Sequence, residues 1–333
     1  SFDDRLNSVV APYCFSILRW ELGHLVGEAD TRPASRESVA ATKGETEPVL
    51  EYLSLSDGIR ALEAHINAMV ATGSREDATD LQQELERLQE RKRALKDTVE
   101  WVIGRQIRET LNRQGIFNPA DAYIRLRVGF PPINFVLDRP PNVLIISPRD
   151  RIESMREVMV VQDVHLEAIE EVEARTDALG VSSLVVELGG FGATYPAFVA
   201  DDASLRFTLH TATEEWLHQY LAFTPLGFMY LLDSIGVSRN YEIATMNETL
   251  ASMVSTEIGE MVLQTYYPQH GVQPPSGGGT SKPEFDFNRV MRELRIAVDQ
   301  LLAQGEIEQA EKLMEERRQY LASKGYYIRK LNQ

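Results

Sequence analysis

Hydrophobic residues recur at three- and four-residue steps between positions 56 and 114, and this spacing predicts two consecutive helices. Ser56 is expected to cap the first helix, which ends at a Thr-Gly-Ser break at 72–74. The second helix carries a heptad seam formed by Leu81, Leu85, Leu88, Leu95, Val99 and Val102. Two interpretations follow: the helices pack on each other as a hairpin, or the seam joins two copies of the chain as a coiled coil.

Short apolar runs replace the helical spacing between positions 133 and 199, which is typical of strands. Strands are expected at 133–137, 143–146, 158–164, 181–188 and 193–199, with a helix at 165–179. The first two strands flank a predicted turn at 138–142. Pro196 has no N–H to donate to a ladder, so the strand 193–199 is expected at a sheet edge.

Two glycine-rich segments are interpreted as connections. Residues 189–192 (GGFG) lack the Lys-Ser/Thr pair that follows a phosphate-binding loop, so they are expected to form a plain turn. Residues 271–284 are Pro-rich and then Gly-rich, which predicts a flexible linker.

Beyond the linker, the helical spacing returns. An amphipathic helix is formed by Val290, Met291, Leu294, Val298, Leu301 and Leu302, and a second helix returns over 307–321. Helical hairpins therefore bracket a central unit of strands and helices, and the predicted class is α+β. The expected parts are a packing helix at 1–28, a hairpin at 56–114, a core at 120–270, the linker and a second hairpin at 285–333.

Composition narrows the classes of function. The chain has 333 residues, of which 43% are hydrophobic and 25% charged, as in an ordinary globular protein. Its net charge is −16 with no basic block, which argues against nucleic acid as a partner. Cys14 is the only cysteine, so an intramolecular disulfide is excluded.

The run 8–18 (SVVAPYCFSIL) is apolar but has only about half of the ~20 residues that a membrane-spanning helix needs. It is expected to pack on the body of the protein. The aromatic and apolar residues near both ends motivate a hypothesis that the parent protein continues into membrane segments. The chain would then be the soluble domain of a membrane-anchored protein.

The candidate chemistry lies on a helix predicted over 209–223. One side of this helix is apolar, and the other places His210, Glu214 and His218 at i, i+4 and i+8. Three potential metal ligands are thus stacked along one face, and Glu215 lies one step round the helix. His210 could replace Glu214 as a ligand from one turn earlier.

The sequence 214–218 (EEWLH) differs by one residue from H-E-x-x-H, in which two histidines hold zinc and the glutamate is a general base. An N-E-x-x-A sequence follows at 247–251. Together these motifs resemble the gluzincin zinc metallopeptidases, whose third ligand is a glutamate in that context on a later helix. Glu214 stands where the family has its first histidine.

The resemblance implies a zincin-like core and a Zn²⁺ cofactor. Glu214, His218 and Glu248 would be the ligands, and Glu215 the general base. An edge strand beside the zinc helix would bind a peptide or protein substrate by strand addition, at Ala193, Thr194 and Tyr195. A Tyr or His near the scissile carbonyl would stabilise the oxyanion, and the candidates are Tyr230, Tyr266, Tyr267 and His270.

Glu214 leaves the activity open. A site with two carboxylates and one imidazole is more anionic than the usual set, so a bound water should be a weaker acid and hydrolysis slower. The leading expectation is a zinc-dependent peptidase. The alternatives are an inactive pseudopeptidase that binds peptides or acts as a scaffold, and a coiled-coil adaptor whose hairpins self-associate.

Overall fold

The computed structural model describes residues 1–16, 45–71, 78–125, 127–162, 164–234, 240–271 and 285–331. The chain divides into two compact units, each assembled from separated parts of the sequence. Unit 1 contains 1–17, 141–188 and 274–333, and unit 2 contains 18–140 and 189–273. Each unit combines helices with a small sheet, so the expected mixture of helices and strands is confirmed. The range 120–270, expected as one core, is shared between the two units.

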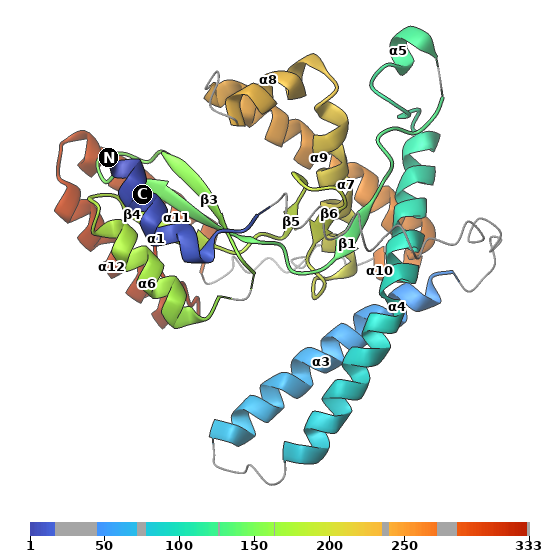
Figure 1. Ribbon diagram of the computed structural model, residues 1–333, viewed down its shortest axis with the longest axis horizontal. Helices are drawn as coiled ribbons and strands as arrows, with labels where there is room; N and C mark the ends of the chain where they lie inside the picture. The colour runs from blue at the N-terminus through green and yellow to red at the C-terminus, as the bar shows by residue number, and fades with distance from the viewer. Residues whose placement is uncertain are drawn as a thin grey trace. The chain divides into compact units, whose positions relative to one another are not determined.

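Unit 1 is built on a three-stranded antiparallel sheet in the order β3-β2-β4 (Figure 1). The strands are β2 (Asn142–Ser147), β3 (Arg156–Val160) and β4 (Ser182–Val186). Helices α1 (Phe2–Val10) and α6 (Leu166–Asp177) complete a core in which Leu6, Val10, Leu144 and Val172 are buried together. The helix expected over 8–18 is not formed, because α1 ends at Val10 and Pro12 lies in a 3₁₀ turn, Ala11–Tyr13.

The predicted C-terminal hairpin is present in unit 1. Helix α11 (Phe287–Ala303) and helix α12 (Ile307–Ser323) meet through Leu294, Val298, Leu302, Ala310 and Met314. Gly305 makes the turn with a φ of +78°, which an L side chain rarely adopts. The predicted linker lies outside the described residues except for Gly271.

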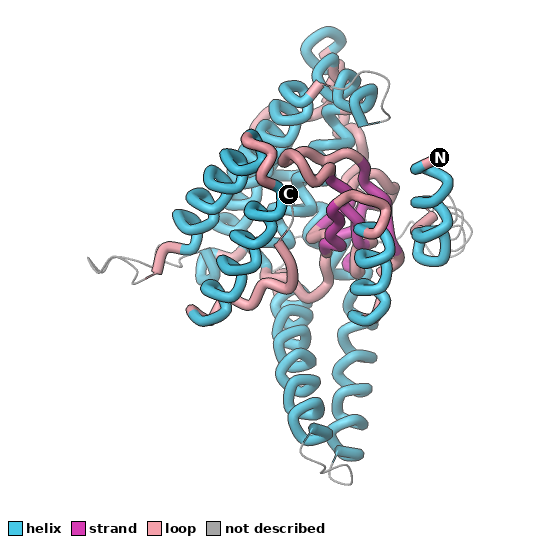
Figure 2. Tube along the Cα trace, turned by 90° about the vertical axis from the view of Figure 1, so that its left-hand side faces the viewer, coloured by secondary structure: helices cyan, strands magenta, loops and turns pink. Residues whose placement is uncertain are grey.

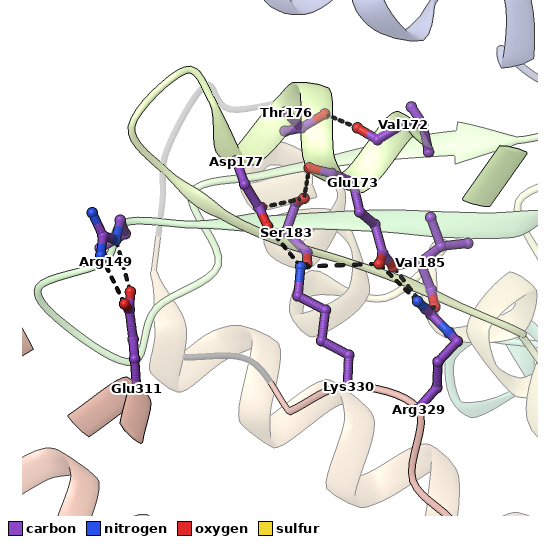
Figure 3. A network of polar contacts seen from close by, with 10 residues as sticks. All are labelled: Arg149, Val172, Glu173, Thr176, Asp177, Ser183, Val185, Glu311, Arg329 and Lys330. Atoms are coloured by element: carbon purple, nitrogen blue, oxygen red, sulfur yellow. Dashed lines mark hydrogen bonds and ion pairs between the residues drawn. The ribbon is translucent and has the colours of Figure 1, made fainter. Parts of the chain in front are cut away.

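A polar network joins the C-terminal segment to β4 and α6 within unit 1 (Figure 3). The Arg329 guanidinium donates two hydrogen bonds of 2.7 Å, one to each oxygen of the buried Glu173 carboxylate. The same carboxylate accepts the Val185 N–H at 2.7 Å, and Arg329 donates to the Val185 carbonyl at 3.1 Å. Lys330 binds Asp177 at 2.8 Å and donates to the Ser183 carbonyl at 2.6 Å. Side chains therefore satisfy the outer backbone groups of β4, an edge strand.

Unit 2 contains the predicted N-terminal hairpin, formed by α3 (Glu47–Ala71) and α4 (Ala78–Arg113), which pack side by side (Figure 2). Val49 and Tyr52 bury against Val99 and Val102. These contacts extend α3 beyond its predicted start, so Ser56 lies inside the helix and not at its cap. Its hydroxyl donates to the Tyr52 carbonyl at 3.1 Å.

The sheet of unit 2 has the order β1-β6-β5. Strand β1 (Phe135–Leu137) runs parallel to β6 (Ala197–Val199), and β5 (Gly190–Phe191) pairs antiparallel with the other side of β6. The two runs on either side of the predicted turn at 138–142 join different sheets, because Phe135 and Leu137 are buried in the core of unit 2 while β2 belongs to unit 1. The predicted edge position of 193–199 is wrong. Strand β6 is central, and Pro196 precedes it.

Two helices of unit 2 position the candidate chemistry. Helix α7 (Leu205–Leu221) begins at Ser204, whose hydroxyl accepts the Phe207 N–H, and helix α9 (Tyr241–Tyr266) begins at Asn240, whose side chain accepts two backbone N–H groups. The helices lie side by side (Figure 1), and Leu209, Ala212 and Trp216 of α7 are buried in one core with Ala251 and Ile258 of α9. Short helices α5 (Asp121–Ile124), α8 (Pro225–Ser234) and α10 (Pro268–Gly271) complete the unit.

Among the described residues, every helix is too short or too polar to cross a membrane.

Candidate functional site

The candidate site lies where α7 faces α9. Burial of Trp216 and Leu217 fixes the rotation of α7, and Trp216 donates its indole N–H to the Pro131 carbonyl at 2.8 Å. With this face in the core, the residues on the other side, Glu214, Glu215 and His218, stay only partly buried. The predicted helix, and the division between its apolar and polar sides, are confirmed.

His218 and Glu248 are brought together from the two helices. His218 Nε2 lies 3.7 Å from Glu248 Oε2. Two ligand atoms bound at about 2.1 Å to one tetrahedral zinc ion lie about 3.4 Å apart, so this spacing suits two ligands of a single ion. The Glu248 side chain is 51% exposed, which leaves the pair accessible from solvent.

Asn247 contacts the second ring nitrogen of His218, Nδ1. It is 1% exposed, and its Nδ2 lies 3.2 Å from His218 Nδ1. Its Oδ1 is buried and has no hydrogen-bond partner among the described residues. A half-turn of the amide places Oδ1 on Nδ1, where it accepts the ring N–H and satisfies the buried oxygen. In that arrangement His218 presents the lone pair of Nε2 to Glu248.

Tyr230 of α8 completes this side of the site. Its hydroxyl donates to Glu248 Oε1 at 2.7 Å, and its ring stacks on His218 with centroids 6.2 Å apart. Of the four aromatic and histidine residues expected near a scissile carbonyl, Tyr230 is the one that the structure brings to the site.

Glu215 lies against the glycine-rich segment. A Cβ atom added to Gly190 would lie 2.3 Å from Glu215 Oε1, and one added to Gly192 would lie 2.4 Å from Oε2. Only glycine permits this approach. Burial raises the pKa of Glu215 to about 8, the charges of Glu214 and Glu248 act in the same direction, and a hydrogen bond from the Gly192 backbone opposes them.

Glu214 lies within electrostatic reach of the His218–Glu248 pair. Burial is the largest cause that raises its pKa, His218 opposes the shift, and the charge of Glu248 adds to it. Within the described part of the chain, however, three His, Cys, Asp or Glu side chains do not converge at metal-binding distance. The donor atoms are chemically suited to zinc, and two of the three expected ligands are adjacent.

His210 does not belong to this group. Its Nε2 lies 3.1 Å from Glu260 Oε1, and Arg206 pairs with the same carboxylate. The ring occupies the space beside Gly259, where an added Cβ would lie 2.2 Å from it. Burial lowers the pKa of His210, and Glu260 opposes that shift. The expectation that His210 could replace Glu214 as a ligand is therefore wrong, because its ring is turned to another part of α9.

Tyr266, Tyr267 and His270 lie at the other end of α9. Tyr266 is eighteen residues from Glu248, roughly 27 Å along a helix at about 1.5 Å per residue. Its hydroxyl donates to Glu109 of α4 at 2.6 Å, and Tyr267 donates to the Gln106 side chain at 2.9 Å. His270 is exposed on α10. Their predicted role beside the reacting carbonyl is wrong, because these residues join α9 to α4 or face solvent.

The three expected substrate-binding residues lie in the turn between β5 and β6. Ala193 and Tyr195 are exposed, whereas Thr194 is buried and donates to the Pro196 carbonyl at 2.9 Å. The edge strand next to Glu215 is β5, not the segment 193–199.

Sequence reasoning missed two contributors to the site. Asn247 was part of a motif, but its contact with the His218 ring was not predicted. Gln219 donates to the Thr194 carbonyl at 3.2 Å and follows Glu215 by four residues, a spacing that could have indicated a shared face.

In comparisons with protein families, curated proteins and solved structures, no match to this chain was found.

Proposed function

We propose that unit 2 is a zinc-dependent peptidase unit of zincin-like architecture, which hydrolyses a peptide bond at the α7–α9 site. The observation that carries the proposal is the approach of His218 Nε2 to Glu248 Oε2, 3.7 Å apart on two different helices. The motifs that resemble gluzincins place ligands at these two positions.

The electrostatics of the pair support a cation. If the Asn247 amide is turned so that Oδ1 accepts the Nδ1–H, His218 Nε2 and Glu248 Oε2 are two electron-pair donors that face each other. Such an arrangement is unfavourable unless a proton or a metal ion lies between them. Glu214 and Glu215 bring two further carboxyl groups close to this pair.

In this proposal His218 and Glu248 hold the ion and Glu214 is the third ligand. When bound, zinc polarises a carbonyl and lowers the pKa of water. Asn247 is a positioning residue that fixes the tautomer of His218. Tyr230 orients the Glu248 carboxylate and is the candidate donor to a developing oxyanion.

Glu215 is the proposed general base. Its carboxylate is held next to Gly192, and its pKa of about 8 lets it exchange a proton near neutral pH. The adjacent edge of β5 is the proposed place for a substrate strand, because an edge strand can pair with an added peptide backbone.

The test is hydrolysis of a mixed peptide library by the full chain with added zinc. Wild-type protein is expected to cleave peptides, and Glu215→Gln is expected to reduce kcat by about a thousandfold or more while zinc still binds, since a base acting in the transition state contributes roughly 10²- to 10⁴-fold. Glu257→Gln, an exposed substitution on α9, is the matched control. Equal rates for the wild type and Glu215→Gln would contradict the assignment of the base.

The second candidate is a pseudopeptidase that binds peptides without cleaving them. It is favoured by Glu214 and by the absence of three converging metal ligands in the described residues. A protein that binds no zinc but binds peptides at β5 would support this candidate. We also propose that any self-association uses the helical hairpins.

A further inference from the structure

A row of side chains on α7 packs against the glycine-rich segment, residues 189–192. Phe207, Thr211 and Glu215 occur at four-residue steps, and Cβ atoms added to Gly189 and Gly190 would lie 2.4 Å or less from these three side chains. Gln219 is the next residue of the row. The backbone of 189–192 therefore follows α7 at a closeness that side chains on the segment would prevent.

Gln219 contacts the turn at 192–194, where the glycine-rich segment ends. Its amide Nε2 lies 3.2 Å from the Thr194 carbonyl and 3.4 Å from the Gly192 carbonyl. The Gly192 backbone packs against the Glu215 carboxylate, because a Cβ atom added to Gly192 would lie 2.4 Å from Oε2. Gly192 thus lies between two side chains of α7: its backbone packs on Glu215, and its C=O accepts from Gln219.

We infer that Gln219 is a positioning residue for Glu215. Its amide holds the 192–194 turn against α7, so that the Gly192 backbone stays packed on the carboxylate and fixes the direction in which Glu215 points. The catalytic consequence rests on the proposed function, in which Glu215 is the general base, whereas the positioning is a property of the fold.

The physical need for such a support is clear. A glutamate side chain has three rotatable bonds, and a catalytic group works only when neighbouring contacts hold it close to one geometry. Thr194 anchors the far end of the turn through its own hydroxyl, which donates to Pro196, but that contact does not reach α7. The Gln219 side chain, in contrast, ties the turn back to α7.

The test uses Gln219→Met in the full chain. Methionine has nearly the same length and flexibility but no N–H donor, so a residue that only fills space would be replaced without loss. Glycine-labelled protein is followed by NMR, and the readout is hydrogen-exchange protection of the Gly192 amide. We expect protection to fall about fivefold to tenfold, the equivalent of one net hydrogen bond. Gln309→Met on the exposed face of α12 is the matched control.

A kinetic arm separates this inference from the proposed function. If the chain is a peptidase, Gln219→Met is expected to lower kcat about tenfold with KM unchanged, because substrate contacts are kept and only the base is misplaced. A wild-type chain without zinc binding or hydrolysis would overturn the proposed function, and the exchange result would still decide whether Gln219 holds the turn. Unchanged Gly192 protection in Gln219→Met would overturn the inference.

Discussion

At the scale of single residues, ionisation of Glu215 lowers the free energy of unfolding. The pKa of Glu215 is 4.5 as an ordinary glutamate and about 8 in the folded chain, chiefly because of burial. Between these values the folded state binds more protons than the unfolded state, so the free energy of unfolding falls as pH rises from about 4.5 to about 8. Above pH 8 the loss is complete. A buried carboxyl group whose pKa is raised this far is typical of a functional site.

Glu215→Gln is therefore expected to stabilise the fold at high pH. One pKa unit corresponds to about 1.4 kcal/mol, and with allowance for partial exposure the gain above pH 8 should be on the order of 2 kcal/mol. At pH 4.5 the gain should vanish. Urea unfolding of chelator-treated protein measures it, with Glu257→Gln as the control. A variant no more stable than wild type at pH 8.5 would show that the carboxylate is not buried as described.

At the scale of elements, close packing between β5 and α7 explains the glycine-rich segment. The sequence GGFG was interpreted as a turn, but its glycines are required where the backbone touches Thr211 and Glu215. Helices were predictable because their apolar stripes are local signals. The pairing of β1 with β6 was not, because strand partners far apart in sequence are chosen by the core that they share. Phe135 and Ala197 are opposed in register and separated by 62 positions, a relation without a local signal.

Gly190→Ala tests this contact. The added methyl group would lie 2.4 Å from Thr211 Cγ2 and 2.3 Å from Glu215 Oε1, and such overpacking costs about 1–3 kcal/mol. Gly129→Ala is the control, since an added Cβ there meets nothing within 4 Å and should leave stability nearly unchanged. Chemical denaturation of both variants gives the comparison. Equal stability of the two variants would place β5 away from α7.

The network of Figure 3 gives a second prediction for an element, the β4 edge. Arg329→Ala removes two short contacts from the Glu173 carboxylate, which is 5% exposed, and leaves the longer contact with Lys330 at 3.9 Å. Disrupting a buried pair in this way should cost up to about 3–5 kcal/mol. Arg318→Ala removes a surface pair with Glu315 one turn away and should cost less than about 1 kcal/mol. Thermal unfolding distinguishes the two outcomes. Similar melting temperatures for both variants would mean that the network does not hold the C-terminal segment.

At the scale of the whole molecule, the two units are interleaved along the chain. Unit 1 takes its strands and helix α6 from the middle of the sequence and its other helices from both ends. The sequence predicted the helical hairpins and the α7 helix, but it treated the middle of the chain as one core. Local patterns indicate which segments are strands, and long-range burial decides which unit each strand joins.

The candidate site was predictable to the extent that its motifs were local. Glu215 and His218 share one turn of α7, and Glu248 was found through its N-E-x-x-A context. The spacing of His210 placed it on the same helix face as the other candidate ligands. Its ring orientation, however, is set by the contact with Glu260, which the spacing does not predict. Tyr230 contacts Glu248 and His218 because α8 packs against both α7 and α9. The spacing of residues in the sequence does not indicate this packing.

Zinc titration of the chelator-treated full chain by calorimetry tests the central claim most directly. We expect about one bound ion per chain, loss of binding in His218→Ala and tighter binding in Glu214→His. Binding should be unchanged in His210→Ala, because His210 is paired with Glu260 and lies outside the site. A folded wild-type chain that takes up no zinc, or that loses zinc equally in His210→Ala and His218→Ala, would contradict a metal centre held by His218 and Glu248.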